Sequence, residues 1–212
     1  QLGVEVRLNT FMEAAEILSF SADLILLATG SYPPDTGFQK AIPHIEKLPG
    51  IEDGGFFSAE DVMARRARLG KRVLILDEGG NWKGCGTALK MAEEGHQVVL
   101  ITPDPLVGKE LQRTAADYPL RQKLAQLGVR FILESAITRW TPQGAEILSF
   151  LDGSTSFVEA DSLVFATPNL AEDTLARELE DSGLKFLNIG DSAGPRQAPF
   201  VISEARRIAL EI

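Results

Sequence analysis

Residues 71–102 read KRVLILDEGGNWKGCGTALKMAEEGHQVVLIT and decide the fold of this chain. The run Lys71–Asp77 is apolar at its centre and predicts a buried strand. Glu78–Gly86 is rich in glycine and predicts a turn, and Thr87–Glu94 has the spacing of a helix. Gly95 caps that helix, and Gln97–Thr102 predicts a second buried strand. Strand, helix and strand in this order form the βαβ unit that opens a Rossmann-like domain.

Two stretches of the chain occur twice, which fixes architecture more firmly than local propensity does. Leu2–Asn9 matches Leu127–Glu134, and each copy predicts a helix end, a glycine cap and a short strand. Ala22–Gly30 matches Ala160–Pro168, and each copy predicts a buried strand of a parallel sheet. The second copy is longer because it contains three short alternating segments, which predict a β-meander around residues 136–140, 146–151 and 156–159.

The two copies differ in what precedes them. The second copy has a complete βαβ unit before Gly128, about 55 residues long, whereas the equivalent glycine of the first copy is Gly3. By analogy the first copy lacks about that length at its amino end, which is the part that would carry its phosphate-binding turn. The chain also opens with Gln1 rather than Met, so we expect a fragment.

The carboxyl end predicts a strand over Leu184–Asp191 and a helix over about 198–212. A strand that runs into the amino end of a helix forms an anion site, because unpaired N–H groups and the helix dipole face the same point. Asp191 is placed to accept hydrogen bonds from a ribityl or ribose hydroxyl. We expect the strand at Leu24–Ala28 to lie beside Leu187–Gly190, and its uncovered edge to make the isolated chain dimerise or aggregate.

The expected fold class is therefore α/β. A Rossmann-like parallel sheet with a β-meander, of the NAD(P)-binding type, is inserted into an incomplete α/β sheet of the FAD-binding type. We expect the inserted domain over residues 69–158. Residues 1–68 and 159–212 are expected to form the first and closing parts of the FAD/ADP-binding-type domain.

Composition excludes several classes of function. The net charge is −9, from 21 Lys and Arg against 30 Asp and Glu, which argues against nucleic acid or an anionic membrane as partner. No apolar run approaches the roughly 20 residues of a membrane span, so we expect a cytoplasmic protein. With Cys85 alone and two isolated histidines, His44 and His96, we expect no metal site. No nucleophile and base occur in a recognisable pattern, so no catalytic residue is assigned.

The order of these elements is similar to that of the two-dinucleotide-binding flavoproteins of the glutathione reductase type. More closely, the chain resembles the carboxyl-terminal FAD/NAD(P)-binding region of the trimethylamine dehydrogenase and 2,4-dienoyl-CoA reductase family, the NADH:flavin oxidoreductases. The residues that carry this resemblance are Lys71–Asp77 with Glu93–Val98, and Ile189–Asp191 with Pro195 and Arg196. The family also includes dimethylamine and histamine dehydrogenases and N-methyl amino acid demethylases.

The resemblance implies a flavin-dependent oxidoreductase as the parent, most readily an amine or N-methyl dehydrogenase or demethylase. In the family this region follows a TIM barrel that carries FMN and usually a Cys-ligated 4Fe–4S cluster, and neither barrel nor cluster motif lies in this sequence. The first fold of the intact parent would hold FAD, or ADP in its place. The implied partners are the upstream barrel and an electron-transfer flavoprotein, and we expect the isolated fragment to be inactive.

Candidate cofactor-binding residues fall into two sets. The ends of the repeated strands and the closing turn contribute Ala28, Thr29, Gly30, Thr167, Gly190, Asp191, Pro195, Arg196 and Gln197. The Gly-rich turn of the inserted domain contributes Asp77, Gly79, Gly80 and Trp82.

That Gly-rich turn departs from the dinucleotide fingerprint. The pattern Gly-x-Gly-x-x-Gly allows a tight turn and close approach of the pyrophosphate, but its three glycine positions here are Asp77, Gly79 and Trp82. An acidic side chain and an indole in these places argue against ordinary NAD(P) binding. The strand after the helix ends in Thr102 and Asp104, with no arginine for a 2′-phosphate.

Two other functions stay open. With its fingerprint broken, the inserted fold could be a docking module for an electron-transfer partner or subunit, through the Trp82 turn and Leu106–Leu111. The basic cluster Arg65, Arg66 and Arg68, predicted on a solvated helix face, could meet such a partner. An NADPH-dependent enoyl-CoA reductase is the third reading, and the missing arginine disfavours it.

Overall fold

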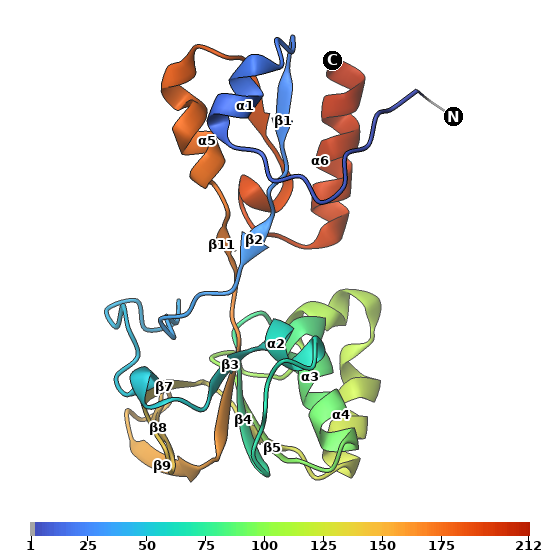
Figure 1. Cartoon of the computed structure of the whole chain (residues 1–212). Coiled ribbons are helices and arrows are strands. Elements are labelled where there is room, and N and C mark those ends of the chain that lie inside the picture. The colour runs from blue at the N-terminus through green and yellow to red at the C-terminus, as the bar shows by residue number, and fades with distance from the viewer. Residues whose placement is uncertain (1–2) are drawn as a thin grey trace. The chain divides into compact units, whose positions relative to one another are not determined.

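The computed structural model describes residues 3–212, which form two compact units (Figure 1). One consists of residues 33–168, and the other of residues 3–32 together with 169–212. These boundaries lie outside residues 69 and 158, where the sequence places them. The reason is that β3 (Phe56–Ser58) and β10 (Ser162–Ala166) both pair within the sheet of the larger unit.

A five-stranded parallel sheet forms the centre of the larger unit. Its strand order is β3-β10-β4-β5-β6, with β4 at Arg72–Asp77, β5 at Gln97–Ile101 and β6 at Arg130–Ile132. The five residues of β4 after Arg72 are all buried. A strand of this kind needs cover on both faces, and the chain segments between the strands provide it.

Helices cover one face of this sheet and the meander covers the other (Figure 1). The helices are α2 (Ala59–Met63), α3 (Trp82–Glu93) and α4 (Asp117–Gln126), with the 3₁₀ turn η2 (Lys109–Thr114) on the same side. The 3₁₀ turn η1 (Ile51–Asp53) packs with the meander. The meander consists of β7 (Ser135–Thr141), β8 (Gly144–Ser149) and β9 (Thr155–Glu159), paired antiparallel in that order. Alternate residues of β4 divide between the two cores: Val73 and Ile75 face the helices, and Leu74 and Leu76 the meander. The expected βαβ unit and meander are confirmed.

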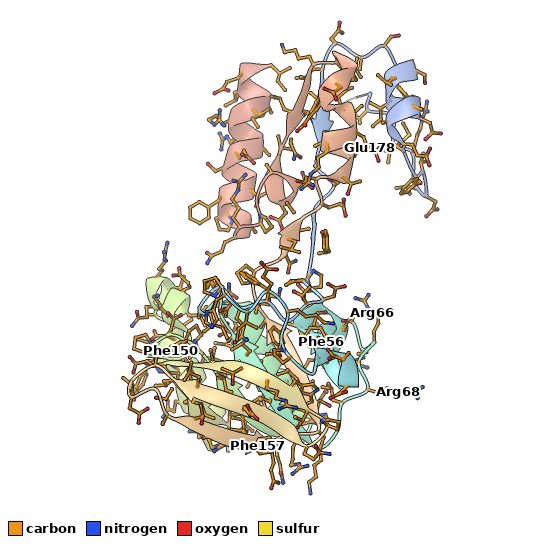
Figure 2. All side chains as sticks on the ribbon, turned by 90° about the vertical axis from the view of Figure 1, so that its left-hand side faces the viewer. Phe56, Arg66, Arg68, Phe150, Phe157 and Glu178 are labelled. Carbon is orange, nitrogen blue, oxygen red and sulfur yellow. The ribbon has the colours of Figure 1, made fainter. Side chains whose placement is uncertain are left out.

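Three aromatic side chains, Phe56, Trp140 and Phe165, lie on the meander side of the sheet. Phe56 of β3, labelled in Figure 2, packs edge to face on Phe165 of β10, with 5.1 Å between ring centroids. Trp140 is buried, and its indole Nε1 donates to the Gly54 carbonyl at 2.7 Å. This bond ties the meander to the loop before β3, which explains why residues 33–55 belong with the larger unit.

The start of α3 differs from the prediction. The helix begins at Trp82, where Asn81 is the N-cap and its side-chain oxygen accepts from the Lys83 N–H at 2.8 Å. Gly84 and Gly86 therefore lie inside the helix, although the sequence assigns them to the turn. An Asn cap ends the turn early because it satisfies one of the unpaired N–H groups of the first helical turn.

The basic cluster also differs from the prediction. Helix α2 starts at a capping box in which Ser58 Oγ accepts the Asp61 N–H at 3.0 Å, but it ends at Met63. Arg65, Arg66 and Arg68 thus follow the helix rather than line its face. Figure 2 shows Arg66 and Arg68 projecting away from this segment.

The described residues of the smaller unit, 3–32 and 169–212, form two short pairs of strands and three helices. Parallel strands β1 (Ile25–Leu27) and β12 (Phe186–Asn188) pair with Leu26 opposite Leu187, so the expected neighbourhood of these distant segments is confirmed. The other elements are β2 (Ser31–Tyr32) paired with β11 (Leu170–Ala171), α1 (Ala14–Ser19), α5 (Thr174–Leu179), η3 (Glu180–Ser182), η4 (Gly190–Ser192) and α6 (Ala198–Glu211).

The strand expected after Gly3 does not form. Both repeat glycines have left-handed backbone, with φ of 70° at Gly3 and 78° at Gly128, but only the second is followed by a strand. Val4, Val6 and Leu8 are more than 70% exposed, and among the described residues no strand pairs with them. β6 forms because β5 lies beside it. Leu2, the predicted helix end of the first copy, lies outside the described residues.

The two units should differ in local stability. Among the described residues the larger unit has buried apolar clusters of sixteen and thirteen residues, and the smaller unit one of four, which are Ile17, Leu27, Ala176 and Leu179. We expect amides of Val73–Leu76 and Val98–Ile101 to exchange at least about 100-fold more slowly than those of β1, a difference of about 3 kcal/mol in opening free energy. Hydrogen exchange followed by NMR tests this. Uniform protection at all protein concentrations would contradict it, whereas protection of β1 that rises with concentration would support self-association.

Candidate functional site

The turn between β4 and α3 is organised around a buried carboxylate. Asp77, the last residue of β4, is fully buried. Its Oδ1 accepts the Gly79 N–H at 3.0 Å and the Gly80 N–H at 2.9 Å, and the Cys85 thiol lies 3.4 Å from Oδ2. The carboxylate thus lies beneath the amino end of α3, where helical N–H groups and the helix dipole favour a negative charge.

Gly84 makes room for that carboxylate. A Cβ on Gly84 would stand 2.3 Å from Asp77 Cγ and 2.6 Å from its Cβ, well inside van der Waals contact. The fingerprint alignment overlooks this residue because it puts the third glycine position at Trp82. In the structure Trp82 is the first residue of α3 and is 56% exposed, so the close approach is made at Gly84 and the indole lies outside it.

The charged side chains near this turn are engaged with one another. Lys83 Nζ lies 2.9 Å from a Glu60 carboxylate oxygen and donates to the Thr167 carbonyl at 2.8 Å. Lys109 Nζ pairs with Asp104 at 2.9 Å. Thr167, predicted from the repeat, thus contributes its backbone oxygen to this region, at the end of the strand next to β4.

Glu78 is a second buried carboxylate at this end of the sheet, and sequence reasoning missed it. It is 3% exposed and accepts the Lys40 N–H at 3.1 Å and the Ala41 N–H at 3.0 Å. These bonds fasten the loop that leads out of the smaller unit to the end of β4. The signal in the sequence was an acidic residue directly after a buried strand, where water cannot easily reach it.

Burial shifts the ionisation of three groups at the turn. It raises the pKa of Asp77 to about 6, although the N–H bonds from Gly80 and Gly79 and the Cys85 thiol oppose the shift. Burial likewise raises the pKa of Glu78. Burial, together with the neighbouring Asp77, raises the pKa of the Cys85 thiol, so that this cysteine stays protonated and is a poor nucleophile.

Most of the residues predicted for the first fold gather around one pocket of the smaller unit. This pocket, of about 380 Å³, lies where β1 and β12 end and α6 begins. Its predicted members are Ala28, Gly30, Gly190, Asp191 and Arg196, and the others are Ile189, Ala198, Val201 and Ile202. Gly30 and Gly190 have left-handed backbone, with φ of 89° and 67°, which side-chain-bearing residues adopt at a cost.

Asp191 is held in that pocket by its neighbours. Ser31 Oγ donates to Asp191 Oδ2 at 3.0 Å, and the Arg196 N–H donates to Oδ1 at 3.4 Å. Ser31 in turn accepts from Asn169 Nδ2 at 3.1 Å. The two other predicted closing-turn residues do not line the pocket: Gln197 is the N-cap of α6 and makes no side-chain cap bond, while Pro195 directly precedes Arg196.

Glu204 is a pocket neighbour that the sequence did not suggest. Its carboxylate accepts the Gly190 N–H at 2.8 Å and forms an ion pair with the Arg196 guanidinium. The Gly190 bond and then Arg196 hold the pKa of Glu204 below its usual value. Glu204 lies two helical turns into α6, so only the tertiary structure brings it to the strand end.

Thr29 lies apart from Ala28 and Gly30. Its hydroxyl donates to the Glu172 carbonyl at 2.5 Å, and it lines a different pocket, of about 760 Å³, with Phe11, Met12 and Glu178. Figure 2 labels Glu178 on α5. Consecutive residues after a strand point to opposite sides, so the predicted Ala28-Thr29-Gly30 set divides between two pockets.

The part of the chain that the structure describes also bears on metal binding and on membrane insertion. No group of three or more His, Cys, Asp or Glu side chains there could hold a metal ion. Among residues 3–212 no helix is both long enough and apolar enough to cross a membrane.

The parallel sheet with its meander, the second unit and the glycine turns at strand ends define a dinucleotide-binding oxidoreductase fold. Residues 4–191 match the family model described as pyridine nucleotide-disulphide oxidoreductase, and the chain belongs to this family. The whole of this chain aligns with cinnamate reductase of Clostridium sporogenes at 31% identity. Of the same chain, 95% aligns with dimethylamine dehydrogenase of a Hyphomicrobium species at 25% identity. The resemblance to the trimethylamine dehydrogenase group is thereby confirmed.

Solved structures agree with this assignment. The 6-hydroxypseudooxynicotine amine oxidase of Pseudomonas geniculata superimposes with a TM-score of 0.86 at 25% identity, over 93% of this chain and 30% of that one. Histamine dehydrogenase of a Rhizobium species gives a TM-score of 0.86 over 96% of this chain at 24% identity, which shows the fold. The chain spans about 30% of the length of cinnamate reductase and of dimethylamine dehydrogenase.

Proposed function

We propose that the chain is the nucleotide-binding region of a larger flavin-dependent oxidoreductase, and that its smaller unit holds the adenylate half of FAD, or ADP in its place. The observation that carries this proposal is the gathering of Ala28, Gly30, Gly190, Asp191 and Arg196 around one pocket at the end of β1 and β12. Ligands of open α/β sheets bind at the carboxyl ends of the strands, where this pocket lies.

The pocket offers suitable chemistry for a nucleotide. Asp191 provides a carboxylate for ribose hydroxyls, and Arg196, whose guanidinium is paired with Glu204, lies at the amino end of a fourteen-residue helix. The left-handed glycines allow backbone to approach the ligand closely. Ala198, Val201 and Ile202 add an apolar wall on which a planar ring can lie.

The activity of the parent is proposed from the relatives. Dimethylamine dehydrogenase and a probable N-methylproline demethylase of Rhizobium meliloti favour oxidation of an amine or N-methyl group. The 31% identity to cinnamate reductase favours, as the second candidate, reduction of an unsaturated acid or thioester, the enoyl-CoA type of reaction. In either case FMN, a 4Fe–4S cluster and the substrate pocket are proposed for other regions of the parent.

A docking role rests on a different surface. The relatives' greater length and the half-exposed Trp82 suit a region that meets other domains of the parent, an electron-transfer flavoprotein or a second copy of the chain. Co-migration with an electron-transfer flavoprotein, and its loss in Trp82→Ala, would support this role over nucleotide binding.

Removal of the Asp191 carboxylate tests the nucleotide site. We expect ADP and FAD to bind the chain weakly, with a dissociation constant of about 1 mM, or about 4 kcal/mol. Asp191→Ala should raise the dissociation constant for ADP about tenfold or more, because the ribose hydroxyls lose their hydrogen bonds to a charged carboxylate. NMR titration with ¹⁵N-labelled protein gives both the constant and the residues that respond.

Two matched variants separate ligand contact from local structure. Ser31→Ala removes the bond to Asp191 Oδ2 but leaves the carboxylate, so affinity should change little. Asp181→Ala removes an exposed carboxylate of the same unit that does not line this pocket. Shifts at Gly30 and Gly190 on adding ADP support the proposal. No response there up to about 10 mM ADP, ten times the expected constant, would show that this pocket is not the nucleotide site.

A further inference from the structure

The turn after β4 is the place where the family's fold would hold the pyrophosphate of a pyridine dinucleotide. Binding there requires backbone N–H groups that point at the ligand from the turn and the helix end. In this chain the Gly79 and Gly80 N–H groups already point at Asp77 Oδ1, at 3.0 Å and 2.9 Å. A carboxylate has the negative charge and the acceptor oxygens of a phosphate. The anion position is therefore occupied by a side chain.

The Asp77 side chain is enclosed by its neighbours in the protein. Its side chain is fully buried, its second oxygen faces the Cys85 thiol at 3.4 Å, and the backbone of Gly84 closes over Cβ and Cγ. A swing toward solvent would break the Gly79 and Gly80 bonds and leave their N–H groups without this partner. Each such loss costs about 1–3 kcal/mol.

The two lysines near the turn are paired with carboxylates, so they do not offset the charge of Asp77 for an incoming dinucleotide. The Lys83 ammonium pairs with Glu60, and the Lys109 ammonium pairs with Asp104. Asp104 Oδ2 lies 3.4 Å from where a Cβ on Gly80 would stand, so a carboxylate flanks the turn from the β5 side as well. A pyrophosphate brought to Gly79 and Gly80 would meet like charge from two elements.

We infer that Asp77 is a built-in anion that closes this fold to pyridine dinucleotides: its carboxylate takes the hydrogen bonds that the pyrophosphate would take, and the larger unit binds neither NADH nor NADPH. The nicotinamide site that the family name implies thus does not fit the residues present. The inference concerns the larger unit alone and does not depend on the nucleotide site proposed for the smaller one.

Substitution of Asp77 tests the inference directly. Asp77→Gly restores the first glycine of the fingerprint and frees both N–H groups, whereas Asp77→Asn keeps an acceptor for them and removes only the charge. We expect no saturable binding of NADH or ADP-ribose to the unchanged protein by calorimetry, and a gain of at least about tenfold in Asp77→Gly. Asp77→Asn should gain less, because the acceptor stays in place.

Folding of the variants is checked by tryptophan fluorescence, because both tryptophans, Trp82 and Trp140, lie in the larger unit. A folded Asp77→Gly protein that binds NADH no better than the unchanged chain would overturn the inference.

A second measurement needs no variant. NADH at about 10 mM, tenfold above a millimolar constant, should leave the Gly79 and Gly80 amide resonances of the unchanged chain in place. A saturable shift of these two resonances would overturn the inference. Shifts at Gly30 and Gly190 report the adenylate pocket of the smaller unit instead, so failure of the proposed function and failure of this inference give different spectra.

Discussion

Gly84→Ala is expected to lower the free energy of unfolding of the larger unit by about 3 kcal/mol. The new Cβ would stand 2.3 Å from Asp77 Cγ, in a place where strand β4 and helix α3 are both buried and cannot separate without exposing core. Helix propensity works in the opposite direction, since alanine favours a helix over glycine by about 1 kcal/mol. The steric overlap outweighs this gain because the nearest atoms belong to the short side chain of Asp77, whose Cβ is held in place by the β4 backbone. Urea denaturation followed by tryptophan fluorescence measures the effect.

The same helix supplies a matched control. A Cβ on Gly86 would come no nearer to other atoms than 3.9 Å, from the Trp82 ring, which is ordinary contact. Gly86→Ala should therefore raise the free energy of unfolding by about 0.5–1 kcal/mol. The double variant Asp77→Gly with Gly84→Ala should lose less than the two single losses added together, because the first change removes the atoms that clash. Equal effects of Gly84→Ala and Gly86→Ala would show that the close approach is not tight.

The architecture of the larger unit was predictable because its signals are local. Strand β4, helix α3 and the meander are each predicted by a pattern within a short window of sequence. These patterns are the apolar run of β4, the apolar spacing of α3 and the turn residues of the meander. The unit's boundaries were not predictable in this way. β3 and β10 join the sheet through pairing with each other and with β4, partners that are far apart in sequence.

Long-range arguments gave one correct prediction and one wrong one in the smaller unit. The interpretation of residues 1–68 and 159–212 as two parts of one sheet predicted that segments about 160 residues apart meet, as the pairing of Leu26 with Leu187 shows. The repeat, by contrast, predicted a strand after Gly3, where the residues are exposed and form no strand. A strand needs hydrogen bonds from a neighbour, and similarity to β6 cannot provide the neighbour that β6 has in β5.

The site was predicted in part. Asp77 was singled out as a departure from the fingerprint, and the structure places it under the turn that the fingerprint would use for phosphate. Gly84, Glu78 and Glu204 were missed because their roles depend on contacts across elements. The fingerprint counts spacing along the chain, and the glycine that makes the close approach, Gly84, lies two residues beyond the position that the fingerprint assigns to Trp82.

Asp77→Asn is expected to stabilise the larger unit at neutral pH and to do so much less at pH 4. The pKa of Asp77 is about 6 in the folded protein, above its usual 3.8. The folded state therefore holds this proton more tightly than the unfolded state does. The stability that this provides is fully present below about pH 4 and is lost as the pH rises through 6. A difference of about 2 pKa units corresponds to about 3 kcal/mol.

Asparagine removes that loss because it does not ionise and still offers an oxygen to the Gly79 and Gly80 N–H groups. The advantage of Asp77→Asn over the unchanged chain should grow by about 3 kcal/mol between pH 4 and pH 7.5, with most of the change between pH 4 and 6. Denaturation at a series of pH values, followed by tryptophan fluorescence, measures this difference in the free energy of unfolding. The difference between the two proteins at pH 4, where Asp77 is protonated in the folded state, serves as the control for the replacement of a carboxyl by an amide group. Glu78, Asp104 and Cys85 are present in both proteins and largely cancel in the difference. A difference in the free energy of unfolding that stays constant between pH 4 and 7.5 would contradict the prediction. It would mean that the helix end and the neighbouring N–H groups stabilise the buried carboxylate as well as water does.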